Sequence, residues 1–313
     1  MSQAIVSPEQ RAVTFLSAEV PRWPVENNCY SCHNNGDAAR ALFAAMRVNL
    51  SVAESAIVDT AIWLGRPDAW DDNALGLEFS DQVLARIQFG SALVAAMDAG
   101  VIDTGAPLVK AASLLAADQK DDGSWRLDTS MSIGSPATYG TALASVSALM
   151  TLQRVGDDRF TEAIARGGQW LRELDVKTVL DAAAVVLGLG HADDALAIRQ
   201  RQVSLTLIVD GQAPSGGWGA YLTTPTEPFD TAVVLLALVS LVDTDELADP
   251  AIAPVELRRF IAEGRLFLLN EQLDDGSWIE TTRPPGQQSY AQWISTTGWA
   301  TLALLATKDI VKM

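Results

Sequence analysis

The chain has 313 residues, of which 49% are hydrophobic and 19% are charged. This composition supports a substantial buried core and argues against disorder. The formal net charge is -17, which excludes non-specific binding to nucleic acid or anionic lipid because both are repelled.

The longest apolar run, residues 231–242, is shorter than the roughly 20 residues that span a bilayer, so we expect a buried helix and no membrane span. The opening residues Met-Ser-Gln-Ala-Ile-Val-Ser-Pro have no basic start and no apolar stretch, and thus no visible signal peptide. A cytoplasmic location is expected if the sequence is complete as written.

The pattern along the chain predicts six hairpins, each an amphipathic helix followed by an almost uncharged one. The first three pairs are expected at 8–20 and 36–47, 51–64 and 80–99, and 107–118 and 139–152. The last three are expected at 160–174 and 179–190, 194–210 and 230–242, and 255–271 and 296–306. The first helix of each pair can face solvent, whereas the second must be buried. Six hairpins close a ring, so we expect one all-α domain over residues 1–313, an (α/α)6 toroid.

Three of the amphipathic helices end in the repeat Gln-x-x-x-Gly-x-Trp, at residues 119–125, 212–218 and 272–278. The glycine is typical of a helix end in the left-handed conformation, and the tryptophan can fold back over that end. The repeat resembles the QW motif of squalene–hopene and oxidosqualene cyclases and of protein prenyltransferase β subunits. The resemblance implies the toroid fold, and it implies no catalytic role for the repeat.

Squalene–hopene cyclases protonate an alkene with an aspartate of a DxDDTA segment. The similar stretch here is Glu227-Pro-Phe229-Asp230-Thr-Ala232, in which Phe229 stands where that family has its proton donor. A phenyl ring donates no proton, and the chain has no DDxxD motif for a metal-bound diphosphate. The resemblance therefore extends to the fold but not to this cyclisation chemistry.

In such a toroid the N-termini of the inner helices meet at one mouth, where helix dipoles stabilise acidic groups. Asp37, Asp81, Asp181 and Asp230 fall at these positions, mostly as expected helix caps. Aromatic residues expected to line or fill the cavity, beside Asp230, are Tyr30, Phe79, Tyr139, Phe229, Tyr290, Trp293 and Trp299.

The segment Cys29-Tyr-Ser-Cys32-His33 directly precedes the first inner helix and contains the only cysteines. Its Cys-x-x-Cys-His spacing predicts haem c, with two thioethers and His33 as axial ligand. This interpretation implies an electron-transfer or redox role with a redox partner, and a periplasmic location. No second axial ligand is visible, because His191 is expected on the other rim as a surface residue.

Zinc is the alternative, with Cys29, Cys32 and His33 as ligands and Asp37, Asp81 or Asp230 completing a tetrahedron. Prenyltransferases and lanthionine cyclases, which share the fold, hold zinc near this mouth, although neither ligand pattern is matched here. A zinc site predicts an enzyme or binding protein for an apolar, isoprenoid-like small molecule. A redox disulfide, two inert thiols, or an interaction module without cofactor complete the alternatives.

Overall fold

The computed structural model describes residues 6–72, 82–127, 139–242, 254–281 and 289–310, and all regular structure in these ranges is helical. The outer helices are α1 (Pro8–Asn27), α3 (Val58–Leu64), α5 (Ala106–Asp118), α7 (Thr161–Glu173), α9 (Ala195–Gly211) and α11 (Pro254–Glu271). The inner helices are α2 (Ala39–Arg47), α4 (Gln82–Asp98), α6 (Gly140–Val155), α8 (Val179–Leu189), α10 (Pro228–Val239) and α12 (Tyr290–Thr307). A π-helical turn, η1 (Cys32–Ala38), leads into α2.

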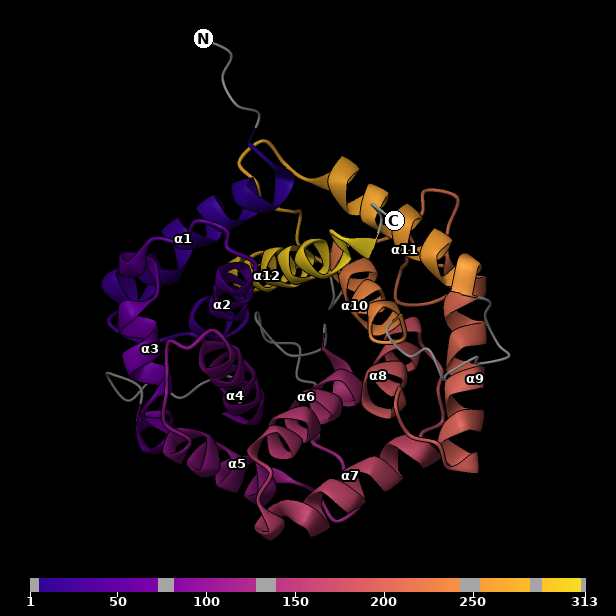
Figure 1. Ribbon diagram of the computed structural model, residues 1–313, viewed down its shortest axis with the longest axis horizontal. Coiled ribbons are helices and arrows are strands. Elements are labelled where there is room, and N and C mark those ends of the chain that lie inside the picture. The colour runs from indigo at the N-terminus through magenta and orange to yellow at the C-terminus, as the bar shows by residue number, and fades with distance from the viewer. Residues whose placement is uncertain (1–5, 73–81, 128–138, 243–253, 282–288, 311–313) are drawn as a thin grey trace.

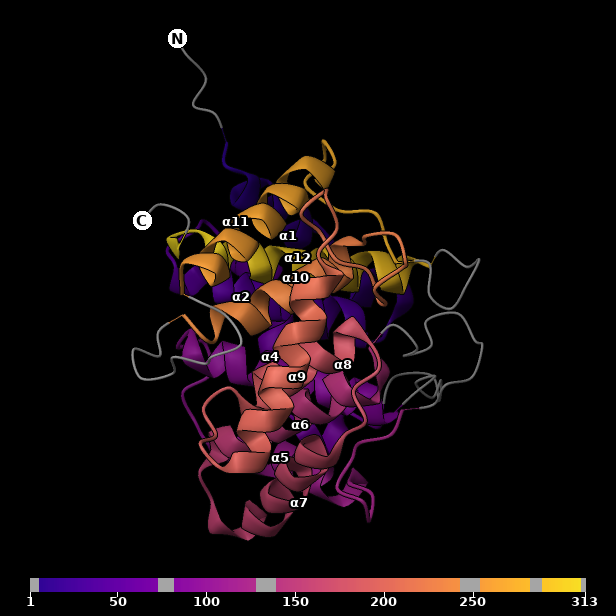
Figure 2. The same ribbon diagram turned by 90° about the vertical axis from the view of Figure 1, so that its right-hand side faces the viewer.

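Outer and inner helices alternate along the chain and form two concentric rings around a central axis (Figure 1). The view from the edge has the outer helix α9 facing the viewer (Figure 2). The predicted (α/α)6 toroid is therefore confirmed. Within the described ranges, none of the helices combines the length and apolarity needed to cross a bilayer.

The two kinds of helix differ in polarity, and this difference decides which helices lie in the inner ring and which in the outer ring. In α10 the only charged side chain, Asp230, is completely buried together with nearly all of its neighbours. In α7, by contrast, acidic and basic residues alternate with a narrow apolar stripe that includes the buried Leu171. A helix that is apolar all round is stable only when covered on every side, which places it in the inner ring.

Each Gln-x-x-x-Gly-x-Trp repeat ties the end of one outer helix to the next. The Gln119 side chain donates to the carbonyl of Gly123 at 3.0 Å and to that of Ala163 in α7 at 2.9 Å. The Trp125 indole folds back and donates to the carbonyl of Leu115 at 2.7 Å. Gly123 has a φ of +89°, but it does not end the helix as the sequence predicts: α5 ends at Asp118, and Gly123 lies in the turn that follows, where its N–H donates to the Lys120 carbonyl at 2.9 Å.

The third repeat closes the ring. Gln272 donates to the carbonyl of Pro8, at the start of α1, at 2.9 Å. Beside it, the buried Glu9 of α1 forms an ion pair with Arg265 of α11, which also donates to Thr307 at the end of α12 at 2.9 Å. The first and last hairpins are thereby joined in the same way as the third and fourth and the fifth and sixth.

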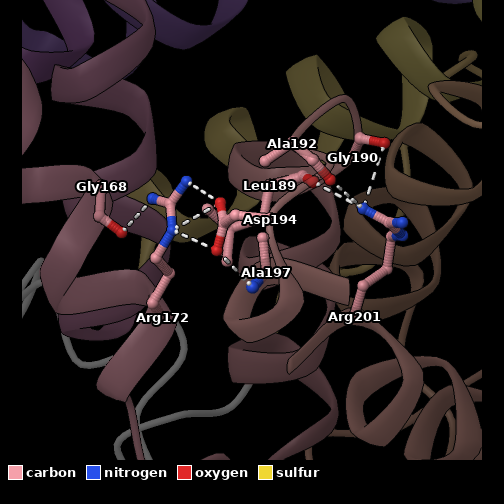
Figure 3. A network of polar contacts seen from close by, with 8 residues as sticks. All are labelled: Gly168, Arg172, Leu189, Gly190, Ala192, Asp194, Ala197 and Arg201. Atoms are coloured by element: carbon pink, nitrogen blue, oxygen red, sulfur yellow. Dashed lines mark hydrogen bonds and ion pairs between the residues drawn. The ribbon is translucent and has the colours of Figure 1, made fainter. Parts of the chain in front are cut away.

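A buried arginine joins α9 to the end of α8 (Figure 3). Arg201 is 1% exposed and donates to the carbonyls of Leu189 and Ala192 at 3.0 and 2.9 Å. A cation is favourable here because the last carbonyls of a helix carry partial negative charge. On the solvent side, Arg172 of α7 pairs with Asp194, the N-cap of α9, at 2.6 Å.

Candidate functional site

The inner helices enclose a cavity of about 410 Å³ in the middle of the toroid. All six inner helices contribute to its wall, which is apolar over most of its length. The apolar lining residues are Ala44, Val94, Ala95, Leu143, Val146, Met150, Leu187, Leu236, Trp299 and Leu302.

The cavity has a charged rim and one charged residue deeper inside. Arg40, Ala44 and Arg47 line it on successive turns of α2, and an α-helix rises about 1.5 Å per residue, so about 10 Å separates Arg40 from Arg47. Arg47 lies at the rim, where Asp98 pairs with Arg154 at 2.8 Å and with Arg47 at 3.8 Å. These residues end α2, α4 and α6. Among the described residues, the cavity therefore opens at the C-terminal ends of the inner helices, opposite to the mouth that the sequence predicts.

Arg40 lies at the inner end of the cavity, over the ring of Trp299. Its guanidinium carbon is 4.9 Å from the ring centroid. In the part of the chain that the structure describes, the Arg40 guanidinium has no hydrogen bond and no ion pair. A partly buried cation on an aromatic face is stabilised by the ring, although its donors remain available.

A buried polar cluster lies behind this end of the cavity, centred on Asp37 of η1. Asp37 is 1% exposed and accepts from the Tyr139 hydroxyl at 2.8 Å and from the Gln88 amide at 2.5 Å. The Trp299 indole in turn donates to the Tyr139 hydroxyl at 3.1 Å. Burial raises the pKa of Asp37, in spite of hydrogen bonds from Ser295 and Tyr139 that act in the opposite direction. Burial, and then the Asp37 charge, also raises the pKa of Tyr139.

Two glycines bring η1 close enough to its neighbours to form this cluster. A Cβ on Gly298 of α12 would lie 2.9 Å from the Asp37 carbonyl oxygen, and one on Gly36 would lie 2.9 Å from Cβ of Gln88. Asp37 does not reach the cavity wall, and its carboxyl group and the Arg40 guanidinium interact electrostatically without forming an ion pair. The cluster can hold a neutral carboxyl in an apolar surrounding, but that carboxyl does not face the cavity.

The Cys29-Tyr-Ser-Cys32-His33 segment lies between α1 and α12. Neither cysteine is part of a disulfide, and both have intermediate exposure. The His33 ring packs edge-on against Trp23 at 4.8 Å and Tyr290 at 5.7 Å. Part of His33 reaches solvent, but its Nε2 is buried and has no hydrogen-bond partner among the described residues. Burial lowers the pKa of His33 to about 3.

Two asparagines that sequence analysis missed, Asn34 and Asn35, hold this segment in place. The Asn34 amide donates to the Tyr290 hydroxyl at 2.9 Å and to the Glu19 carbonyl at 2.7 Å. The Asn35 amide donates to the carbonyl of Val20, which Pro24 leaves without a backbone donor. This bond helps α1 to continue to Asn27, beyond the predicted end at residue 20. The signal available in the sequence was Pro24 followed by Asn34 and Asn35, because a proline leaves one helix carbonyl without its backbone donor and a side-chain amide can replace that donor.

Those of the proposed zinc ligands that the structure describes do not come together. No three His, Cys, Asp or Glu side chains in the described ranges converge so as to hold a metal ion. That result covers Cys29, Cys32 and His33 as well as Asp37 and Asp230, whereas Asp81 and Phe79 lie outside the described residues. Asp181 forms a capping box with Thr178, as its expected capping role predicts.

The predicted aromatic residues form two groups. Phe229 is buried behind the cavity and packs against Tyr139 at 6.0 Å and Trp299 at 5.9 Å. Near His33, the Tyr290 ring stacks on Trp23 and contacts Trp293, and the Tyr30 ring stacks on Trp63 at 4.5 Å. Of the predicted cavity residues that the structure describes, Trp299 alone is on the wall of the central cavity.

No protein-family description and no curated protein matches this sequence. Solved structures match over the whole length. The apo type II terpene cyclase MstE from Scytonema is 16% identical with a TM-score of 0.55, covering 97% of this chain and 100% of that one. The Lin0763 protein from Listeria innocua is 9% identical with a TM-score of 0.58, covering 97% of this chain and 98% of that one.

A possible member of the GH105 family from Klebsiella pneumoniae is also 9% identical with a TM-score of 0.58, covering 100% of this chain and 96% of that one. At these identities the likeness shows the fold alone. The chain therefore has the α/α-toroid fold that these proteins share.

Proposed function

We propose that this protein binds an apolar, isoprenoid-like small molecule in the central cavity. The observation that supports this proposal is the cavity of about 410 Å³ with an apolar wall, shared by all six inner helices. Small-molecule sites typically have volumes of about 300–1,000 Å³ and mostly apolar linings.

The structural neighbours give independent support. MstE structures have been solved with geranylgeranyl dihydroxybenzoate as substrate and with merosterolic acid A as product. The proposal is limited to binding, because Asp98 is the only acid of the described residues on the cavity wall and it is paired with Arg154 and Arg47. Phe229 is buried at the position of the family's proton donor, and Asp37 does not reach the cavity wall.

The test is a calorimetric titration of the purified chain with farnesol and geranylgeraniol. We expect saturable binding to one site, and at least about tenfold weaker binding by Leu236→Trp, which fills the middle of the cavity. The matched control is Val203→Trp, which places the same side chain on the exposed surface of α9 and should bind as the wild type does. Absence of saturable binding to both alcohols, or equal binding by Leu236→Trp, would overturn the proposal.

We propose, as a second candidate function, that Cys29, Cys32 and His33 carry haem c. The observation that favours it is the buried Nε2 of His33, since unpaired buried polar atoms are rare and cost about 1–3 kcal/mol. The donor set fits, because haem c needs two accessible thiols and one imidazole but no convergence of three ligands on one metal. His33 would have to turn out from between Trp23 and Tyr290 to become the axial ligand. Bound haem would supply one-electron redox chemistry.

The test is co-production of the chain with a cytochrome c maturation system in an exported form. A covalent Soret-absorbing product that is lost in Cys29→Ala and Cys32→Ala supports haem attachment. Colourless protein of unmodified mass rules it out, and stoichiometric zinc in that protein would establish the alternative.

A further inference from the structure

We infer that the ligand of the central cavity carries a carboxylate, which pairs with Arg40 at the inner end while the hydrocarbon part fills the cavity toward the rim. This inference rests on the proposed function, since it names the chemistry of the molecule that occupies the same cavity.

The primary evidence is the position of Arg40. It lines the cavity on the first turn of α2, and Trp299 covers one face of its guanidinium. The same group has no hydrogen bond or ion pair to the described residues. A planar guanidinium presents a fork of N–H donors that matches a carboxylate in a bidentate pair.

The nearest acid does not serve as a partner for Arg40. Both oxygens of Asp37 already accept hydrogen bonds, from Tyr139 and from Gln88, and the Asp37 carboxylate forms no contact ion pair with Arg40. Burial of Asp37 also favours its neutral form. Among the described residues, Asp37 therefore attracts Arg40 only at longer range, and the guanidinium has no direct hydrogen bond or ion pair at the end of an apolar cavity.

A wholly apolar ligand would increase this imbalance. Hydrocarbon packed on Arg40 would remove its remaining water without replacing the lost hydrogen bonds, which is costly for a cation. A carboxylate compensates one positive charge with one negative charge. A diphosphate would bring more negative charge than the single arginine at this end can neutralise.

The rim is consistent with entry of the carboxylate first. Two arginines, Arg47 and Arg154, share the single carboxylate of Asp98 there. The rim therefore has an excess positive charge although the whole chain has a net charge of -17. Such a local field attracts an anion to the opening, but its arginines are already paired, unlike Arg40.

The experiment compares four probes of similar hydrocarbon length: farnesoic acid, methyl farnesoate, farnesol and farnesyl diphosphate. Binding to the full chain is measured by calorimetry for the wild type, Arg40→Met and the matched control Arg47→Met. Wild type should bind the acid about tenfold to hundredfold more tightly than the ester, the range expected for a charge-assisted pair. Arg40→Met should lose this preference and bind the ester at least as well as wild type does, which also shows that the variant is folded. Arg47→Met should keep the preference.

Equal affinity of the wild type for acid and ester, or an unchanged preference in Arg40→Met, would overturn the inference while leaving the proposed function intact. Tightest binding of the diphosphate would also overturn it. Failure of all four probes to bind would count against the proposed function itself.

Discussion

Asp37 accepts hydrogen bonds from side chains that lie far from it in the sequence. Its hydrogen-bond donors, Gln88 and Tyr139, lie on different inner helices, and the Trp299 indole completes the cluster from α12. The sequence identifies Asp37 as a residue at an inner-helix start, for which capping is the ordinary role. Its partners could not be predicted, because they depend on which turns of four helices face one another. The orientation of His33, which Trp23 and Tyr290 fix, could not be predicted for the same reason.

The raised pKa of Asp37 predicts a stability effect with a definite sign. The folded state holds the proton more tightly than the unfolded state, so Asp37 stabilises the fold below its unfolded pKa, and this contribution is lost as the pH rises through the folded pKa. Asp37→Asn stays neutral, and its amide can donate to Tyr139 while its oxygen accepts from Gln88. We expect its free energy of unfolding relative to wild type to rise from pH 3 to pH 8 by on the order of 1 kcal/mol. Urea unfolding at several pH values checks this, and a pH-independent difference would contradict it.

At the scale of elements, the repeats explain why so much of the fold is predictable. Each Gln-x-x-x-Gly-x-Trp marks the end of an outer helix, and the contrast in polarity assigns each helix to a ring. The open end of the cavity was not predictable in this way. The rim charges Arg47, Asp98 and Arg154 are, in the sequence, ordinary charged residues at helix ends, and only the packing of α2, α4 and α6 brings them together.

Gly216 tests the role of the repeats. Its φ is +87°, and an added Cβ would lie 2.5 Å from the backbone oxygen of Glu263 in α11. Gly216→Ala should therefore separate α9 from α11 and lower the free energy of unfolding by about 2–4 kcal/mol.

Gly105→Ala is the matched control, because Gly105 has a φ of -78° and no atom within 4 Å of the added Cβ. That change should alter the free energy of unfolding by no more than about 1 kcal/mol, because the smaller entropy of the unfolded chain is offset by the poorer N-cap of α5. Thermal unfolding of both variants provides the measurement, and equal effects would show that the close approach at Gly216 is unimportant.

At the scale of the whole molecule, stability depends on a ring that must close. The closing contacts are Gln272 to Pro8 and Glu9 to Arg265, each linking α11 to α1. Burial raises the pKa of Glu9, but hydrogen bonds from Arg265, the Glu9 backbone and Ser7, together with the charge of Arg265, lower it by more, so its net shift is downward. The contribution of Glu9 is thus present above its unfolded pKa and is lost as the pH falls through its folded pKa.

Glu9→Gln should lower the free energy of unfolding at pH 7 by about 3 kcal/mol, the scale of a broken buried ion pair. As the pH falls from 7 through the folded pKa of Glu9 toward pH 2, protonated Glu9 comes to resemble glutamine, so the difference from wild type should shrink. Urea unfolding at both pH values measures this, and a difference of the same size at both would show that the charge of Glu9 is not responsible.

Because the closing contacts join α11 to α1, the ring of hairpins would stay closed if the chain began at a different hairpin. Thr307 and Glu9 bind the same side chain, that of Arg265, so the two ends of the described chain lie beside each other. A short flexible linker could join them, and new termini could be opened in the turn between α6 and α7 without removing any link of the ring. Such a circular permutant should keep the cavity. The hairpins thus have a cyclic arrangement although the chain itself is linear.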